Sequence, residues 1–463
     1  MSVKKNNAVR EVLAAKSFGE AVDKLPCGAI EALAAVPTFI FLYVCLVGFA
    51  RNFLDPEAYV TGSPVPFHYV FRDACLPALI VGVFAVLLSV IKKKRKGGLP
   101  APGRFVKENT YIVFFAVLYL LIFVSTCVNG FTEYPLHGYP YRGENLFTVF
   151  CYFLAFFLPV TLIGSEKLRR AVICVFMVFG IIMGIFALVK ASKFGLKYGD
   201  LMGIFSQFNH YAYFLTMTIS ASGVLMICEK SVPIKILAGV SFVFGTVVLV
   251  VNDTFGGQLS TAAALILVPV MISLNKGKFR PAALIPLAVY LLASVAASFF
   301  IGTTENYSQF GGDVTNIATG NATGSEGSNR LNLWTFTIDK IKQKPIFGHG
   351  LEGITDVLYK YTTDNNMFPN NRPHNEFLQY AAFYGIPAAI AYTLGCFSVF
   401  LRGLRLRKQL DSPQISALAA AFAYLVSSFV GNTMYYTSPM FFIYLGLACA
   451  VNNNSNEKPD TAL

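Results

Sequence analysis

Charged residues are scarce in this chain. Asp, Glu, Lys and Arg make up 13% of its 463 residues, whereas a soluble domain usually carries about 25%. Hydrophobic residues make up 55%, and they come in uninterrupted runs of the length that crosses a bilayer, about 20 residues each. The composition therefore excludes an ordinary water-soluble enzyme and predicts an all-α, polytopic integral membrane protein.

Ionisable side chains are almost absent from the interior of the apolar runs. Asp, Glu, Lys and Arg gather at the ends of the runs, and His210 lies within one, near its outer end. Ion-driven transporters usually carry an intramembrane charge along their pathway, so a transporter of that kind is disfavoured. A flippase or exporter of lipid-linked saccharides with a broad polar cavity stays open as the alternative, and a non-enzymatic membrane scaffold is a third interpretation.

Cysteine motifs and a cleavable targeting signal are also missing. The nine cysteines include no C-x-x-C pair, and most lie in or beside apolar runs, where cysteine packs as a small hydrophobe. We therefore predict no disulfide framework and no metal site. Residues 1–28 lack the apolar segment of a signal peptide, so we expect the first apolar run to be a retained helix.

Twelve hydrophobic runs are present, and we expect each to form a membrane-spanning helix. The run 236–251 is the weakest, and only residues 252–255 separate it from the next run. We expect these residues to form a tight turn; the alternative is one long re-entrant segment. The runs lie near 29–50, 73–91, 110–128, 145–163, 171–190, 202–228, 236–251, 256–274, 282–301, 377–400, 414–431 and 437–451.

The distribution of basic residues predicts the orientation. With the N-terminus inside, 25 of the 37 Lys and Arg residues lie in segments expected on the cytoplasmic side, and six of the other twelve lie in the long loop 302–373. Cytoplasmic loops are enriched in Lys and Arg, and long loops translocate largely regardless of charge. We expect a multi-pass protein of the plasma or inner membrane with both termini cytoplasmic. The net charge of +12 is then an orientation signal, and no nucleic-acid partner is predicted.

This topology divides the chain into five parts. We expect a cytoplasmic N-terminal segment, a nine-helix membrane region, a long extracytoplasmic loop, a three-helix membrane region and a cytoplasmic tail. Their bounds are 1–28, 29–301, 302–373, 374–451 and 452–463.

The long outer loop contains a helical pattern. Apolar residues recur at helical spacing from 329 to 341, which predicts an amphipathic helix lying on the outer membrane surface. Arg330 and Trp334 lie one turn apart on it. Read singly, Arg330 is a solvated charge and Trp334 an interface anchor. The residues of the expected apolar face are Leu331, Trp334, Ile338 and Ile341.

Two further polar segments lie at the outer ends of runs. In NNRPHNEFL at 370–378, His374 is either a polar residue at a span boundary or a chemical group, because imidazole titrates near neutral pH. In GIFSQFNHYA at 203–212, the polar residues are expected to face the bundle interior or a cavity. Hydrogen bonding between helices is the alternative for them. These residues are Gln207, Asn209 and His210.

Three motifs together resemble the O-antigen ligase-like family of membrane glycan ligases and polymerases. Their order and the long outer loop before the His-Asn segment also match that family. The similarity of motifs covers roughly residues 200–400. The motifs are Arg330-x-x-x-Trp334 with PIFGHG at 345–350, HNEFLQ at 374–379 with GIP at 385–387, and the segment 203–212, which is similar to G-x-F-x-N-x-N-x-x-A.

The resemblance implies that a glycan moves from a polyprenyl-diphosphate carrier to a hydroxyl of a glycan or glycolipid acceptor at the outer face. It implies His374 as the catalytic base and Arg330 as the catalytic residue that stabilises the leaving diphosphate. No D-x-D motif stands in the outer loops, so a reaction without metal or cofactor is expected. The candidate substrate-binding residues are Arg372, Trp334, Asn375, Glu376, Gln207, Asn209, His210 and Arg142.

One departure from the family pattern leaves alternatives open. The family often carries an arginine near the start of the eighth span, whereas DTFGGQL at 253–259 has no basic residue. If a second arginine is required, another basic residue must supply it, and the sequence does not choose among the candidates. It also does not separate ligase from polymerase. The candidates are Arg142, Arg372, Lys193 and Lys197.

Overall fold

A computed structural model describes most of the chain, and its regular elements are α-helices and one 3-10 helix, with no strand in the described ranges. The predicted all-α class is therefore confirmed. The described ranges are 10–54, 67–96, 102–139, 144–194, 208–301, 315–316, 318–321, 326–367, 369–434 and 437–450.

The helices of the described ranges have the following bounds. In chain order they are α2 (Phe18–Lys24), α3 (Cys27–Leu54), α5 (Phe67–Arg95), α6 (Pro102–Glu108), α7 (Thr110–Asn129), α8 (Glu133–His137), α9 (Leu146–Leu162), α10 (Glu166–Phe194), α11 (Phe208–Cys228), α12 (Val232–Val251), α13 (Phe255–Lys276), η1 (Pro281–Leu284), α14 (Ile285–Ile301), α16 (Glu326–Gln343), α17 (Thr355–Asp364), α18 (Glu376–Tyr384), α19 (Ile386–Arg405), α20 (Ser412–Ser428) and α21 (Ser438–Cys449).

Seven of the described helices are long and apolar enough to cross a membrane, or up to eight if the bent pair of α2 and α3 counts as one span. Three shorter apolar helices add to these, at 146–162, 281–297 and 438–449. Each of the twelve hydrophobic runs contains helix, and a multi-pass membrane protein follows from this. The count of twelve spans, the division into five parts and the orientation stay predictions.

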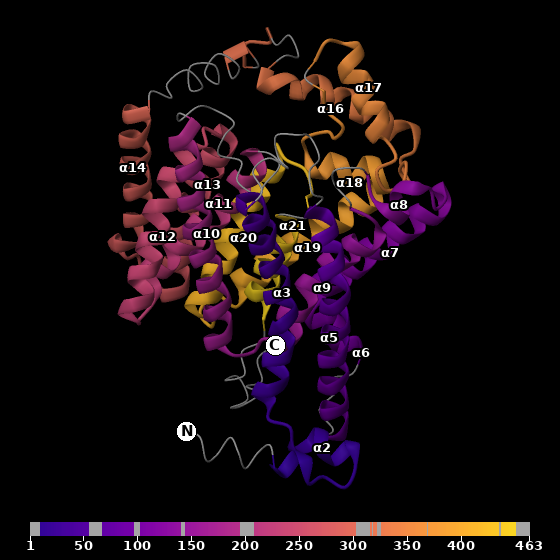
Figure 1. The fold of residues 1–463 in the computed structure, drawn as a ribbon, viewed down its shortest axis with the longest axis vertical. Helices are drawn as coiled ribbons and strands as arrows, with labels where there is room; N and C mark the ends of the chain where they lie inside the picture. The colour runs from indigo at the N-terminus through magenta and orange to yellow at the C-terminus, as the bar shows by residue number, and fades with distance from the viewer. Residues whose placement is uncertain are drawn as a thin grey trace.

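Burial separates central helices from peripheral ones. In α11, 83% of the apolar window is buried within the protein, against 33% in α5. The central helices α11, α20 and α21 lie in the middle of the bundle, and α16 and α17 cover the end opposite to α2 (Figure 1). Because a peripheral helix presents its remaining apolar surface outward, α5 is suited to contact lipid.

The tight turn predicted between the seventh and eighth runs is confirmed. Helix α12 ends at Val251 and α13 begins at Phe255. The side-chain amide of Asn252 donates to Thr254 Oγ1 at 2.7 Å and to the carbonyl oxygen of Phe208 at 2.9 Å. The turn is therefore bonded to the start of α11.

The tenth run is not one continuous helix, which corrects the expectation for 377–400. It is broken at Gly385 into α18 and α19. Gly385 has φ +94°, and a Cβ there would lie 2.0 Å from the carbonyl oxygen of Ile346. Only glycine fits such a position, and Pro387 in the first turn of α19 has no N–H to continue the preceding helix.

The segment PIFGHG at 345–350 fills this break. The N–H groups of His349 and Gly350 donate to the carbonyl oxygens of Ala382 and Phe383, at 2.9 and 2.7 Å. Ile386 N–H donates in turn to the carbonyl oxygen of Pro345 at 2.8 Å. The motif thus satisfies the carbonyl groups that α18 leaves open at its end, and it joins the outer loop to the helix that follows His374.

Candidate active site

Helix α16 is the amphipathic helix predicted in the outer loop, with a rotated buried face. Its buried residues are Leu333, Thr337 and Ile341, which lie four positions apart on one face. Ile338, expected on the buried face, is 41% exposed. The helix packs against α18, so protein rather than lipid covers its buried face. Its place on the membrane surface stays a prediction.

Arg330 lies near the start of α16 and is half-buried. Its Nη1 donates to the carbonyl oxygen of Gly327 at 2.8 Å. Its Nε is enclosed and has no hydrogen-bond partner among the described residues, and no carboxylate within that part of the chain pairs with it.

Trp334 is half-buried, and its ring packs against the main apolar core. Its Nε1–H is enclosed and finds no acceptor within the described ranges. An enclosed indole N–H usually has a partner. The Trp334 indole is an exception to this pattern.

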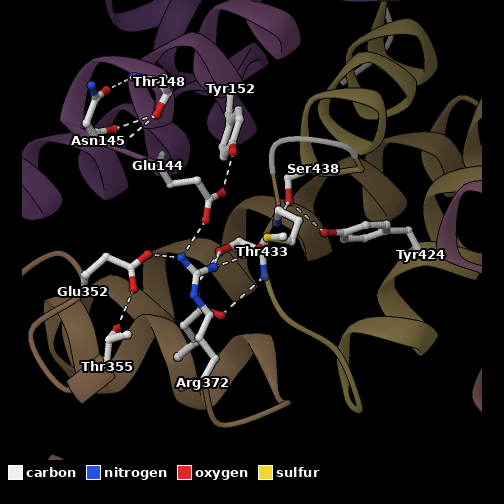
Figure 2. Close-up of polar contacts among 12 residues, drawn as sticks. Glu144, Asn145, Thr148, Tyr152, Glu352, Thr355, Arg372, Tyr424, Thr433 and Ser438 are labelled. Carbon is white, nitrogen blue, oxygen red and sulfur yellow. Dashed lines mark hydrogen bonds and ion pairs between the residues drawn. The ribbon is translucent and has the colours of Figure 1, made fainter. Parts of the chain in front are cut away.

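Arg372 has a different environment, shown in Figure 2. Its side chain is 1% exposed and pairs with Glu144 at 2.7 Å and with Glu352. Nη1 also donates to the carbonyl oxygen of Thr433 at 2.6 Å. Burial acts to lower the pKa of Arg372, but the two carboxylates outweigh burial and raise it. The guanidinium is a fixed cation that joins the segments of Glu144, Glu352 and Thr433.

The two carboxylates have further partners. Tyr152 of α9 donates to Glu144 at 2.5 Å, and Thr355 of α17 donates to Glu352 at 2.5 Å. Figure 2 shows these residues converging on Arg372 from separate helices. A buried ion group is tolerated when its oxygen and nitrogen atoms are bonded in this way, so the cluster is part of the fold of the outer end.

The turn between α20 and α21 forms hydrogen bonds with several parts of the candidate site. Val430 accepts a hydrogen bond from the Tyr213 hydroxyl at 3.1 Å. Asn432 bonds to His374, and Thr433 bonds to both Arg372 and Gln379. Val430, Asn432 and Thr433 carry no charge, yet they connect α11, α18 and the segment before α18.

His374 is held on both sides by amide side chains. Its main-chain N–H donates to Asn432 Oδ1 at 2.8 Å, its Nε2 lies 2.8 Å from Asn370 Oδ1, and its Nδ1 lies 3.5 Å from Asn432 Nδ2. Its φ of +51° is uncommon for a residue with a side chain. The ring is half-buried and is oriented by its neighbours rather than free to rotate.

Asn375 and Glu376 are directed away from the His374 ring. Asn375 Oδ1 accepts from Leu378 N–H at 3.0 Å, as an N-cap of α18, which is a common use of Asn. Glu376 is 0% exposed, and its Oε1 lies 3.5 Å from the Tyr424 hydroxyl. The His374 ring contacts Asn370 and Asn432, and the substrate-binding roles of Asn375 and Glu376 stay predictions.

The start of α11 lies beside the turn between α20 and α21. His210 is 2% exposed, and its ring centroid lies 6.1 Å from that of Tyr213. Asn209 is half-buried. Gln207 and Arg142 lie outside the described residues, as does Lys197, and of Lys193 only the place in α10 is described.

Sequence reasoning missed the partners of the predicted residues. Glu144, Glu352 and Asn432 carry no motif of their own, and their pairing depends on segments far apart in the chain. One signal was present: the polar run Gly431-Asn432-Thr433 interrupts two apolar runs on the predicted outer side. Among the described residues no group of three His, Cys, Asp or Glu side chains could hold a metal ion; a metal-independent reaction stays a prediction.

Comparison with known proteins points to one family. None of the curated proteins matches the chain. A family model, Wzy_C, described as O-antigen ligase, matches residues 240–393. That segment runs from α12 into α19 and includes Arg330, Trp334, Arg372 and His374. Over this segment the chain is similar to the O-antigen ligase family.

Proposed function

We propose that the chain transfers a glycan from a polyprenyl-diphosphate carrier to a hydroxyl of a glycan or glycolipid acceptor at the extracytoplasmic face of the plasma or inner membrane. The observation that carries this proposal is the His374 ring, held between Asn370 and Asn432 inside the segment that matches the O-antigen ligase family. A histidine that served only as a polar residue at a span boundary would not require two amide side chains to hold its ring.

The hydrogen bonds favour one tautomer of His374. A main-chain N–H can only donate, so Asn432 Oδ1 faces it and Asn432 Nδ2 faces His374 Nδ1. Nδ1 is then the unprotonated nitrogen, and Nε2–H donates to Asn370 Oδ1. The contact between His374 Nδ1 and Asn432 Nδ2 is long, 3.5 Å. The hydroxyl of the glycan acceptor can therefore take the place of Asn432 Nδ2. Nδ1 is therefore the base of the proposed reaction.

The proposed transfer is a displacement at C1 of the donor sugar. The acceptor oxygen forms a bond to C1 while the bond from C1 to the diphosphate oxygen breaks. The acceptor proton passes to His374 Nδ1, and the electron pair of the broken bond stays on the diphosphate. An imidazole that titrates near neutral pH is suited to this proton transfer.

Arg330 is proposed to stabilise the charge on the leaving diphosphate. A guanidinium forms paired hydrogen bonds with phosphate oxygens. No carboxylate in the described chain pairs with Arg330, whose Nη1 donates to a carbonyl oxygen, whereas two carboxylates already neutralise Arg372. We therefore assign Arg330 to the diphosphate and treat Arg372 as a positioning residue.

Trp334 is proposed to line the path by which the polyprenyl tail reaches the site from the bilayer. It lies on the turn of α16 that follows Arg330, and its ring is half-buried against the apolar core. Sugar binding by the outer end of α11, through Gln207, Asn209 and His210, stays a proposal from the resemblance. The same holds for Arg142, Asn375 and Glu376.

The proposal is tested in a strain that lacks the chromosomal gene and carries variants on a plasmid. His374→Ala and Arg330→Ala should abolish surface glycan while the protein level is unchanged. His137→Ala and Lys360→Ala are matched controls, because both side chains are exposed in α8 and α17, and they should restore the glycan. Normal surface glycan in both His374→Ala and Arg330→Ala would contradict the proposal.

The lipid-linked species that accumulates separates the two activities. Loss of a ligase leaves long glycan on the carrier, whereas loss of a polymerase leaves single repeats. A flippase or exporter would instead leave the lipid-linked saccharide on the inner face. Protection of that species from externally added reagents in the His374→Ala strain would favour the flippase alternative.

A further inference from the structure

The end of the bundle remote from the candidate active site contains a cavity of about 560 Å³. It lies where α13 ends, between the connection to η1 and the loop after α19. Helix α13 begins at the turn bonded to α11 and runs 22 residues to Lys276, about 33 Å at 1.5 Å per residue. The cavity is therefore separate from the residues around His374.

The loop that forms one wall is bonded to the helix that forms the other. Asn275, 7% exposed, donates from its amide to the carbonyl oxygens of Arg407 and Leu410, at 2.6 and 3.0 Å. Gly277, with φ +70°, ends α13 and turns the chain toward η1. The two walls are thus fixed relative to each other.

The cavity combines an apolar wall with three cations. Val270, Phe279 and Leu284 line it and are 49%, 59% and 43% exposed. Lys278, Arg407 and Lys408 line its rim. An exposed apolar wall beside clustered cations is the pattern expected of a site for an amphiphilic anion.

The carboxylates near the cavity already form ion pairs with other arginines. Asp411 pairs with Arg169, and Glu229 pairs with Arg170 at 2.7 Å. In the part of the chain that the structure describes, none of the three cations on the rim forms an ion pair with a carboxylate. Their charge is therefore available to an external anion.

We propose that this cavity binds one anionic phospholipid. The phosphodiester and its glycerol headgroup lie against Lys278, Arg407 and Lys408. The part of an acyl chain nearest to the headgroup lies along the wall of α13 near Val270. The apolar wall favours a lipid over a free phosphate ion, because a free ion would leave that wall unused. In the predicted orientation these residues face the cytoplasmic leaflet, where anionic lipids attract basic segments. This proposal does not depend on glycan transfer.

The test is native mass spectrometry of the full chain in detergent with added dioleoyl-phosphatidylglycerol. Replacing the three rim cations by glutamine should weaken binding of this lipid about tenfold or more. A control with the same change of charge, at exposed residues elsewhere on the basic face, should change it less than about threefold. The rim variant is Lys278→Gln, Arg407→Gln, Lys408→Gln, and the control is Lys93→Gln, Lys94→Gln, Lys235→Gln.

A second variant separates a lipid from a free anion. Val270→Trp fills the apolar wall without changing the charge, and should also weaken phosphatidylglycerol binding, about tenfold. Millimolar inorganic phosphate should not compete, and dioleoyl-phosphatidylcholine should bind less. Equal losses in rim and control variants, competition by phosphate, or unchanged binding in Val270→Trp would each overturn the proposal. A thermal unfolding curve checks that each variant is folded.

Discussion

The two outer arginines that the sequence offers for diphosphate binding lie in contrasting surroundings. Arg372 is 1% exposed and is enclosed by Glu144 and Glu352. Arg330 is half-buried, donates to the carbonyl oxygen of Gly327 and pairs with no carboxylate in the described chain. The same side chain is thus neutralised at one place and available at the other. This difference in partners supports the proposal that Arg330, rather than Arg372, binds the diphosphate.

The largest expected effect is on folding, at Arg372. Arg372→Gln leaves two buried carboxylates without their cation, and breaking such a pair costs about 3–5 kcal/mol. We expect a matching fall in the thermal unfolding temperature of the purified protein, or loss of the protein from the membrane. Arg330→Gln is the matched control and should change stability by less than about 1 kcal/mol. Equal stability of the two variants would contradict the inferred difference between the surroundings of Arg372 and Arg330.

A combined variant sharpens the same comparison. Glu144→Gln with Glu352→Gln removes both carboxylates, so adding Arg372→Gln to this pair should cost much less than in the native protein. The non-additivity, measured as the difference in unfolding free energy around the cycle, should be about 1–3 kcal/mol. Strict additivity would mean that the ion cluster does not act as a unit.

The next effect is on the rate, at Arg330. Arg330→Gln should lower the rate of glycan transfer by about 10²–10³, because a donor to the developing charge is lost. Arg330→Lys keeps the charge but not the paired hydrogen bonds, so it should recover only part of the rate. The measurement is transfer by purified protein at saturating donor, with Lys360→Gln as a charge-matched control. A native rate in Arg330→Gln contradicts the assignment.

A smaller effect is expected at Asn370, which positions His374 from outside α18. Asn370→Ala removes the acceptor at Nε2 and should lower kcat about tenfold without raising the donor KM. Asn370→Asp keeps an acceptor oxygen and should retain more activity than Asn370→Ala. A change confined to KM in both variants would instead indicate that Asn370 contacts substrate.

The smallest effect is expected at Trp334. Trp334→Ala should raise the KM for a polyprenyl donor about threefold to tenfold, because an aromatic contact with the substrate is lost. Trp334→Phe should restore most of the affinity. The control is Phe336→Ala, since Phe336 stacks on Tyr361 at 4.0 Å and serves the packing of α16 on α17. Unchanged donor use in Trp334→Ala would exclude the path proposed there.

Local patterns in the sequence predicted the elements of the fold. The helical spacing around Trp334 predicted α16, and the four polar-rich residues after Val251 predicted the turn before α13, since both depend on neighbours in the chain. The break at Gly385 was missed, although Gly385 and Pro387 are typical of a backbone break, because the apolar run continues through them. The break is stable because a distant loop supplies N–H groups from His349 and Gly350 to the end of α18.

The candidate site could be predicted only as separate residues. His374 and Arg330 were found through residue chemistry and family resemblance. The surroundings of His374 and Arg372 were not, because Asn432 approaches His374, and Glu144 and Glu352 approach Arg372, through tertiary packing. Arg372 shows the consequence: its sequence context suggested a phosphate-binding residue, and its partners indicate a positioning one.

The most direct test of the central claim is glycan transfer by the purified protein in proteoliposomes that contain a polyprenyl-diphosphate-linked glycan and an acceptor. The account predicts transfer by the native protein and by His137→Ala, and a rate about 10²–10⁴ lower in His374→Ala with an unchanged unfolding temperature. Transfer by His374→Ala at the native rate, or movement of the lipid-linked glycan across the bilayer without transfer, would contradict it.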